Sequence, residues 1–369
     1  MLKPRKCVRE LRPYHSPLSA VEPELRLDMN ESTTGCSPRV LARLQSLDAK
    51  TIALYPSREK AERMVSAVIG RPPAQILLTN GADEGIDLVC RAYIEPEEEM
   101  IVIPPAFPMY EVFGQAAGAK VVKVPAGPDF QFPLAEVLAA INPRTRMIVI
   151  TNPNNPTGAV TKDTEIMQVL KAAPDAAVLV DEAYYEFYGQ SMMNSIGLYP
   201  NLFITRTFSK AYGLAGMRVG VLVGATDHMS AVRRTAGPFN LNVFAVECLQ
   251  EALRDQKFVN DYVTQVRTTR EWFSKQMEEL GFKFWPSAAN FVLVNLGEHK
   301  EAILAQMRTW GIALRDRPDC EGCVRITIGK QQEMEVVVLA LKQALSLLTG
   351  KKEEKNNDEK NEEEEQPAQ

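Results

Sequence analysis

The chain has 369 residues, 45% of them apolar, and a formal net charge of −5. Its length suits about two domains of ~150 residues each, with enough apolar residues for a sizeable core. No apolar run reaches the ~18 residues that span a bilayer, and we expect no secretory signal in the first ten residues. Residues 351–369 hold four Lys and eight Asp or Glu, so the rest of the chain is near −1, without the basic excess of a nucleic-acid-binding protein.

Six cysteines are scattered along the chain, which does not resemble a disulfide framework. Reduced thiols in a cytoplasmic protein are the simpler interpretation. Cys320 and Cys323 form a C-x-x-C pair, but there is no second pair and no neighbouring His. We therefore interpret them as two thiols beside a strand and predict no metal site.

The middle of the chain alternates short β-branched runs with amphipathic stretches. The predicted strands are 76–79, 100–103, 121–124, 147–151, 177–181, 202–205 and 219–223, and the helices between them include 84–93, 108–117 and 164–172. Repeated strand–helix–strand order predicts an α/β domain with a mostly parallel sheet. Ligands of such sheets bind at the carboxyl ends of the strands.

The pattern changes after about residue 237 to long helices and fewer strands. The predicted elements are helices 243–254, 258–280 and 332–348 and strands 290–294, 312–315 and 324–328. This predicts a smaller α/β domain over 241–349, joined by an N-terminal segment (1–44), beside a large domain over 45–240. Residues 350–369 are too polar to bury a core, so we expect a disordered acidic tail.

A lysine lies among small hydroxyl residues and glycines just after a predicted strand. Thr207, Ser209 and Lys210 are followed eight residues later by Arg218. A lysine at the mouth of a pocket can be desolvated and kept partly neutral, as attack on an aldehyde requires. The hydroxyls and the arginine suit a dianionic phosphate, although a surface lysine in a glycine-rich loop would look similar.

Two further strand ends carry polar groups. Asn155 lies in the rigid turn NNPTG after the strand 147–151, and Asp181 ends the strand 177–181. A buried acid is costly unless it meets a cation, and a protonated pyridine nitrogen is such a cation. A helix cap would also explain Asp181 alone.

A strand–glycine–helix junction at 79–85 offers a site for a phosphate. Ala82 and Asp83 follow Gly81 there, and the free N–H groups at a helix start bind anions. Such a junction alone is weak, but the phosphate cradle, the acid, the Asn and the Lys–Arg pair occur together in one chain.

These motifs resemble those of the fold-type I pyridoxal-phosphate (PLP) aminotransferases, over residues 8–348. The general motifs are NNPTG, DEAY and SKAYGLAGMRVG. Within that group the chain resembles the histidinol-phosphate aminotransferases, through VRELRPY at 8–14, LYP at 54–56, GADEGIDL, and LRD followed by CVRITIG. The resemblance implies the PLP-dependent transferase fold, a large domain with a mostly parallel sheet plus a smaller α/β domain.

The resemblance also implies roles around the cofactor ring. Lys210 would bind PLP as a Schiff base, and Asp181 would pair with the pyridine nitrogen. Asn155 and Tyr184 would hydrogen-bond the phenolic oxygen of the ring. The two ring faces would lie against Phe107 and Ala183.

The same resemblance assigns the two anionic ends of the site. The cofactor phosphate would be held by Ala82, Asp83, Thr207, Ser209 and Arg218, with Tyr55 from a second subunit, which implies a homodimer. The substrate would be bound by Tyr14, Arg315 and Arg325. Two departures concern this region: Phe107 stands where many relatives have Tyr, and the stretch between Arg315 and Arg325 is short.

The expected reaction is transfer of an amino group from histidinol phosphate to 2-oxoglutarate, in two half-reactions in which Lys210 moves the proton. An aromatic amino acid (Phe or Tyr) aminotransferase is the nearest alternative, since Arg325 can also bind a carboxylate. Threonine-phosphate decarboxylase is a second alternative from the same group. A PLP-binding regulator is a third, but such proteins add a DNA-binding domain, and the fifty or so residues before the Tyr55 motif already match the enzyme.

Overall fold

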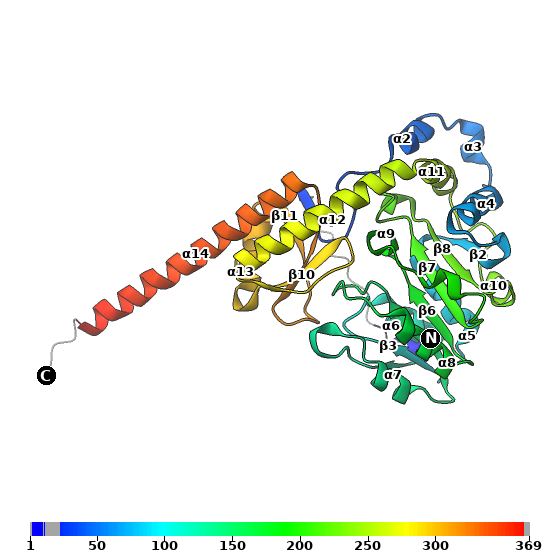
Figure 1. Cartoon of the computed structure of the whole chain (residues 1–369), viewed down its shortest axis with the longest axis horizontal. Coiled ribbons are helices and arrows are strands. Elements are labelled where there is room, and N and C mark those ends of the chain that lie inside the picture. Colours follow the sequence, from blue (N-terminus) through cyan, green and yellow to red (C-terminus); the bar gives the residue numbers. More distant parts are fainter. Residues whose placement is uncertain (1, 10, 12–22, 365–369) are drawn as a thin grey trace.

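The structure, a computed structural model, describes residues 2–9, 11 and 23–364, without the side chains of 349–364. Two sheets dominate it: a seven-stranded sheet and, beside it, a smaller five-stranded one (Figure 1). No helix within the described residues is long and apolar enough to cross a membrane.

The seven-stranded sheet is mostly parallel, as the sequence predicts. Its order is β2-β8-β7-β6-β5-β3-β4, and only β8 runs antiparallel to its neighbours. Its strands are β2 (Ile76–Thr79), β3 (Glu99–Val102), β4 (Lys120–Lys123), β5 (Thr145–Thr151), β6 (Ala177–Asp181), β7 (Leu202–Thr207) and β8 (Gly220–Gly224). β2, β3, β6, β7 and β8 are buried along their whole length, because helices cover both faces of a parallel sheet.

The core divides into two layers, one on each face of this sheet. Successive side chains of a strand point to opposite faces, so Ile148 and Val149 of β5 belong to different apolar clusters. The surrounding helices are α2 (Pro38–Gln45), α3 (Ala49–Ala53), α4 (Arg58–Ile69), α5 (Gly81–Tyr93), α6 (Met109–Ala117), α7 (Leu134–Ala140), α8 (Asp163–Ala172), α9 (Tyr185–Tyr188), α10 (Thr226–Arg233) and α11 (Val243–Arg254). A short helix, α1 (Lys6–Arg9), lies against α6.

The smaller sheet combines the C-terminal part of the chain with one strand from the N-terminal segment. Its order is β1-β11-β12-β10-β9, and β1 pairs in parallel with β11. Its strands are β1 (Leu25–Leu27), β9 (Lys283–Phe284), β10 (Phe291–Asn295), β11 (Ile312–Asp316) and β12 (Cys323–Thr327). Helices α12 (Gln256–Glu279) and α13 (Lys300–Thr309) contact this sheet, and α14 (Gln331–Glu364) packs against both of them. Helix α12 runs from the neighbourhood of α11 to the smaller sheet, so it connects the two parts of the molecule (Figure 1). The predicted domain boundaries remain predictions.

The last helix extends into the polar end of the chain, for which the disordered tail stays a prediction. The structure continues α14 to Glu364, through most of the acidic segment (Figure 1). Lys, Glu and Gln are among the better helix formers, so a helix that starts on a packed apolar face can continue into such a segment without a core.

Candidate active site

A cavity of about 400 Å³ opens at the carboxyl ends of β5, β6 and β7. These strands end at neighbouring positions, since Thr151 pairs in register with Asp181 and Asp181 with Thr205. Thirteen residues predicted for the site line the cavity: Ala82, Asp83, Phe107, Asn155, Asp181, Ala183, Tyr184, Thr207, Ser209, Lys210, Arg218, Arg315 and Arg325. The fold therefore brings together side chains that the sequence places more than two hundred residues apart.

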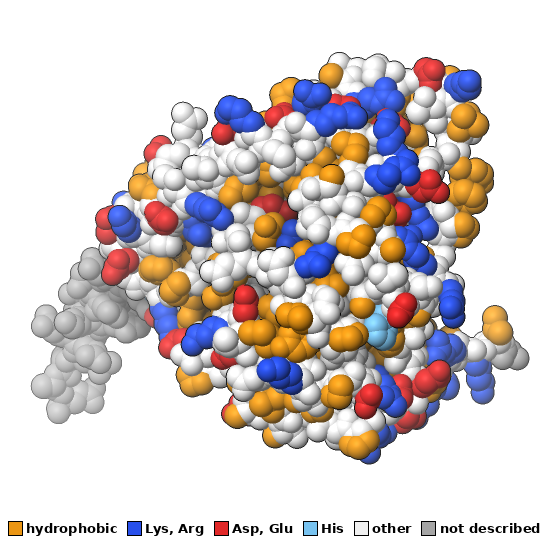
Figure 2. Space-filling model, turned by 45° about the vertical axis from the view of Figure 1, so that its right-hand side comes forward, with side chains coloured by type: hydrophobic (Ala, Val, Ile, Leu, Met, Phe, Trp, Pro, Cys, Tyr) orange, Lys and Arg blue, Asp and Glu red, His pale blue; other side chains and the backbone are white. Residues whose placement is uncertain are grey.

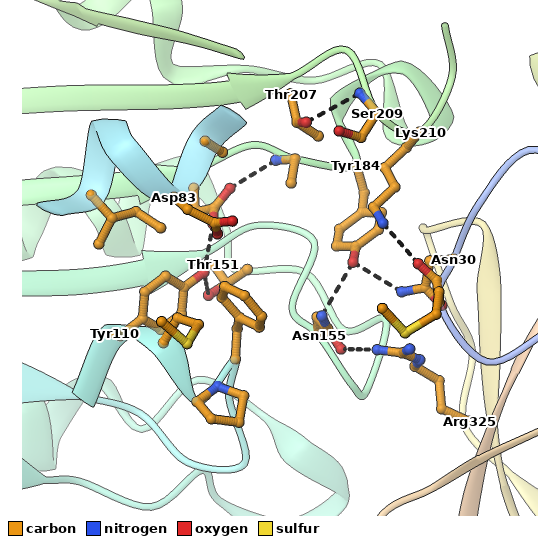
Figure 3. A pocket seen from close by; sticks show the side chains of 18 of the residues that line it. Asn30, Asp83, Tyr110, Thr151, Asn155, Tyr184, Thr207, Ser209, Lys210 and Arg325 are labelled. Atoms are coloured by element: carbon orange, nitrogen blue, oxygen red, sulfur yellow. Dashed lines mark hydrogen bonds between the residues drawn. The ribbon is translucent and has the colours of Figure 1, made fainter. Parts of the chain in front are cut away.

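Lys210 follows β7 and points into this cavity, where its Nζ donates to the Met29 carbonyl at 2.8 Å (Figure 3). Burial, reinforced by the positive charge of Arg325, lowers the pKa of Lys210 to about 8. In roughly a tenth of the molecules the Lys210 amine is then neutral at pH 7, a far larger fraction than for a lysine in water. A neutral amine is the nucleophile that an aldehyde needs.

Asp181 ends β6 at the floor of the cavity and is 4% exposed. Its carboxylate accepts the Tyr110 hydroxyl at 2.6 Å and the Ala183 N–H at 3.0 Å. Burial raises the pKa of Asp181 to about 6, against the lowering effect of these two hydrogen bonds. A buried acid that faces a cavity in this state is suited to a cationic partner.

A row of hydrogen-bonded side chains lies across the cavity from Tyr110 (Figure 3). The Tyr184 hydroxyl accepts from Asn155 Nδ2 at 3.2 Å and from Asn30 Nδ2 at 2.9 Å. Asn155 Oδ1 in turn accepts from Arg325 at 2.7 Å, and Arg325 also donates to the Asp28 carbonyl at 2.6 Å. Asn155 and Tyr184 are thus oriented toward one point, as binding of a single ring oxygen would require.

The opposite end of the cavity is shaped for a phosphate. Helix α5 begins at Gly81, whose φ of +77° suits glycine, and a Cβ there would lie 2.7 Å from Arg218 Nη2. A Cβ at Gly220 would lie 2.6 Å from the Ala82 nitrogen. Arg218 forms an ion pair with Asp83 at 3.0 Å beside this helix start. Backbone N–H groups, an arginine and the Ser209 and Thr207 hydroxyls converge there, which is the donor set that a phosphate monoester takes.

The substrate end is built by the smaller sheet. Arg315 on β11 and Arg325 on β12 are register partners in an antiparallel pair and both line the cavity. Arg317 lines it as well, held by Asp319 at 2.5 and 2.8 Å and donating to the Ala106 carbonyl at 3.3 Å. Arg317 was not predicted, although alternation along a strand places it on the same face as Arg315.

Two predicted residues remain. Tyr14 lies outside the described residues, and Tyr55 is not among the residues that line the cavity. Tyr55 is 76% exposed and stacks on Phe239, with ring centroids 4.1 Å apart. Its predicted role is to contact the cofactor phosphate of a second subunit. That role depends on dimer formation and stays a prediction.

Several lining residues have no signal in the sequence. Asn30 and Met29 come from the N-terminal segment, and Tyr110 and Thr151 form a separate buried pair beside Asp181. Each is identified only by contacts between elements far apart in the chain.

The C-x-x-C pair lies behind the site as two free, buried thiols. Burial raises the pKa of Cys320 to about 12 and that of Cys323 to about 11. Thiols in this state are poor nucleophiles. Within the described residues no group of three or more His, Cys, Asp or Glu side chains could hold a metal ion.

The sequence matches the family Aminotransferase class I and II over residues 22–341. It is 34% identical to the histidinol-phosphate aminotransferase of Dehalococcoides mccartyi strain CBDB1, over 86% of this chain and 89% of that protein. It is 32% identical to the enzyme of the same name from Moorella thermoacetica, over 93% of each chain.

The fold is similar to that of histidinol-phosphate aminotransferase from Sinorhizobium meliloti, solved in complex with pyridoxal-5′-phosphate. The TM-score is 0.86 at 24% identity, over 94% of this chain and 99% of the other. The cavity holds the groups that this cofactor needs: an amine for its aldehyde, an acid for its ring nitrogen and a cradle for its phosphate. The chain therefore belongs to the class I and II aminotransferases and is a PLP-dependent enzyme with the fold-type I architecture.

Proposed function

We propose that this aminotransferase transfers the amino group of histidinol phosphate to 2-oxoglutarate, giving imidazole-acetol phosphate and glutamate. The observation that carries the substrate proposal is the pair of facing arginines, Arg315 and Arg325, at the end of the cavity opposite the cofactor phosphate cradle. Like charges directly opposite in a sheet repel, so an anion between them is favourable. The names of the relatives from Dehalococcoides and Moorella support the same substrate.

The geometry above supports the roles that we propose for the residues around the cofactor. Bound PLP supplies an electron-withdrawing ring that makes the substrate Cα–H acidic. Lys210 would hold the cofactor aldehyde, and its amine, when free, would carry the proton of the substrate Cα. Asp181 would keep the ring nitrogen protonated, while Asn155 and Tyr184 would hold the phenolic oxygen. Phe107 and Ala183 would confine the ring between them.

The two half-reactions require one site to bind two different acids. Arg325 can hold the phosphate of the amino donor and a carboxylate of 2-oxoglutarate, because the guanidinium binds either anion in the same bidentate way. Arg315 and Tyr14 complete the phosphate site. Since the second substrate enters only after the first product leaves, we expect ping-pong kinetics.

We also propose a homodimer that acts in the cytoplasm. Exposed apolar side chains gather on and near α2, α3 and α11: Leu41, Ile52, Leu54, Tyr55, Phe239 and Phe244. Figure 2 shows hydrophobic side chains along the upper right edge of one face, and others among the basic and acidic side chains over the rest of it. An apolar patch of this kind is typical of a protein–protein interface.

The substrate proposal is tested by single-turnover absorbance measurements on the PLP-loaded protein. L-histidinol phosphate, phenylalanine, tyrosine and threonine phosphate are added separately, without a keto acid. We expect histidinol phosphate to convert the bound cofactor to its amine form most efficiently, measured as the rate of loss of the visible band.

The other donors distinguish the alternatives. Faster conversion by phenylalanine or tyrosine would keep the chemistry and replace the substrate. Release of carbon dioxide from threonine phosphate would indicate the lyase instead. Arg315→Gln is the matched variant. It should slow the conversion of the cofactor by histidinol phosphate far more than that by phenylalanine, because only histidinol phosphate carries a phosphate for Arg315 to bind.

A further inference from the structure

Asp181 is held by a buried tyrosine that has no role in the proposed chemistry. Tyr110 lies on α6, is 1% exposed, and places its hydroxyl 2.6 Å from Asp181 Oδ2. Thr151, at the end of β5, places its hydroxyl 2.9 Å from the oxygen of Tyr110 (Figure 3). Three elements of the large sheet layer thus meet at a row of three polar groups, Thr151, Tyr110 and Asp181.

The direction of these hydrogen bonds is fixed by the chemistry of the groups. An ionised carboxylate only accepts, so the single hydroxyl proton of Tyr110 must point toward Asp181. The lone pairs of Tyr110 then face Thr151, whose hydroxyl donates to them. Thr151 therefore favours the one orientation of the Tyr110 hydroxyl that stabilises charge on Asp181.

We propose that Tyr110 is a positioning residue whose hydroxyl, oriented by Thr151, holds the Asp181 carboxylate ionised and aimed at the cofactor ring nitrogen. The proposal rests on the assignment of Asp181 to that nitrogen made above. According to this proposal, the buried Asp181 carboxylate needs the hydrogen bond from Tyr110 to stay ionised.

The charges around Asp181 make such a donor necessary. Burial raises the pKa of Asp181, and the nearby carboxylates of Asp83 on α5 and Glu182 after β6 raise it further. The hydrogen bonds from the Tyr110 hydroxyl and the Ala183 N–H lower the pKa against these effects, and that from Tyr110 has the larger effect of the two. Tyr184 also faces this acid, but its neutral hydroxyl is turned toward Asn30 and Asn155. The other two carboxylates are paired with arginines, Asp83 with Arg218 at 3.0 Å and Glu182 with Arg206 at 2.8 Å.

The first test uses the full chain without cofactor and compares Tyr110→Phe with the wild type. The folded pKa of Asp181, about 6, lies above its ordinary value of 3.8, so its contribution to stability is present at low pH and is lost as pH rises through about 6. Loss of the hydroxyl should raise the pKa by about one unit or more, a tenfold change in the ionisation constant. The apparent Tm of the variant should therefore keep falling relative to the wild type as pH rises from about 6 to about 8.

Tyr93→Phe is the matched control. Tyr93 lies on α5 in the same apolar cluster as Tyr110, and its hydroxyl contacts His228 Nδ1 at 2.8 Å instead of an acid. Its removal should change the apparent Tm by a similar amount across the same pH range. An equal, pH-independent change in Tyr110→Phe would overturn the proposal and leave Tyr110 as a packing residue.

The second test uses the loaded enzyme and a readout other than turnover. With PLP labelled with ¹⁵N in its ring, the nitrogen resonance of Tyr110→Phe should move toward that of an unprotonated pyridine, while that of Tyr93→Phe should not. The kcat should fall about tenfold with little change in KM. An unmoved resonance together with a pH-dependent change in Tm would confirm the hold on Asp181 and contradict its assignment to the ring nitrogen.

Thr151→Val tests the other half of the row. It should shift the pKa of Asp181 in the same direction as Tyr110→Phe, but less, because the acid itself still orients the Tyr110 hydroxyl. In the Tyr110→Phe background the Thr151 substitution should add nothing, since the two groups act through one hydrogen bond. Additive effects would show that Thr151 acts independently of Tyr110.

Discussion

Burial of Lys210 in the cavity makes its amine reactive. Its pKa of about 8 results first from desolvation and then from the charge of Arg325. The positive form is thus disfavoured in the folded protein, and the neutral form is present at the pH of a cell. The Met29 carbonyl keeps the amine pointing into the cavity in the meantime.

We expect the rate at which the cofactor-free protein takes up PLP to rise roughly tenfold between about pH 7 and pH 9 and then level off. Stopped-flow absorbance of the forming visible band measures this rate. A rate that keeps rising toward the ordinary lysine value of 10.5 would contradict the lowered pKa. Lys210→Ala is the control: it should fold, show no such band and lose transamination.

At the scale of elements, the strands that carry the site could be predicted from sequence. β6 has the predicted bounds, 177–181, because a strand buried on both faces is a continuous apolar run. Its last residue could then be singled out as an unusual buried acid. The antiparallel direction of β8 could not be predicted, because the apolar pattern of a strand does not encode the direction of its neighbours.

The partners of the site residues were harder to predict than the residues themselves. Asn30 reaches Tyr184 across 154 residues of sequence, and Tyr110 reaches Asp181 across 71. Neither contact follows from periodicity or spacing, because it depends on how β1 and α6 pack against the large sheet. Sequence thus predicted most of the polar groups that line the cavity and missed the groups that hydrogen-bond to them from behind.

A buried ion pair joins β6 and β7 just below the cavity. Arg206 on β7 contacts Glu182 at 2.8 Å, and the two side chains are 10% and 1% exposed. Glu182 also accepts from Ser191 and from the Met192 N–H, and the guanidinium lies 3.5 Å from the Tyr185 ring centre.

We expect Arg206→Met to lower the free energy of unfolding by ~3–5 kcal/mol, because it leaves a buried carboxylate without its cation. Denaturant unfolding followed by circular dichroism measures this loss. Lys257→Met removes an exposed ion pair with Asp261 and should cost less than ~1 kcal/mol. Similar small losses in both variants would mean that water or another group stabilises the buried Glu182 carboxylate when Arg206 is absent.

At the scale of the molecule, the site in one chain is incomplete if the dimer proposal is correct. Tyr55 is held against Phe239 on the surface, away from its own cavity, within a patch of exposed apolar side chains. The predicted role of Tyr55 requires a twofold axis near this patch that brings Tyr55 of each chain to the cofactor phosphate of the other. Dimers with a twofold axis are by far the commonest assemblies, and each forms two equivalent sites.

Mixing two inactive variants tests this arrangement. Lys210→Ala lacks the amine, and Tyr55→Ala lacks the tyrosine that would reach the partner subunit's cofactor. After joint refolding, each mixed dimer has one site with both defects and one site with neither, so activity should return to roughly a quarter of the wild-type value. Tyr93→Phe with Lys210→Ala controls for refolding. If each chain used its own Tyr55, mixing would restore nothing, and light scattering would then tell a dimer with separate sites from a monomer.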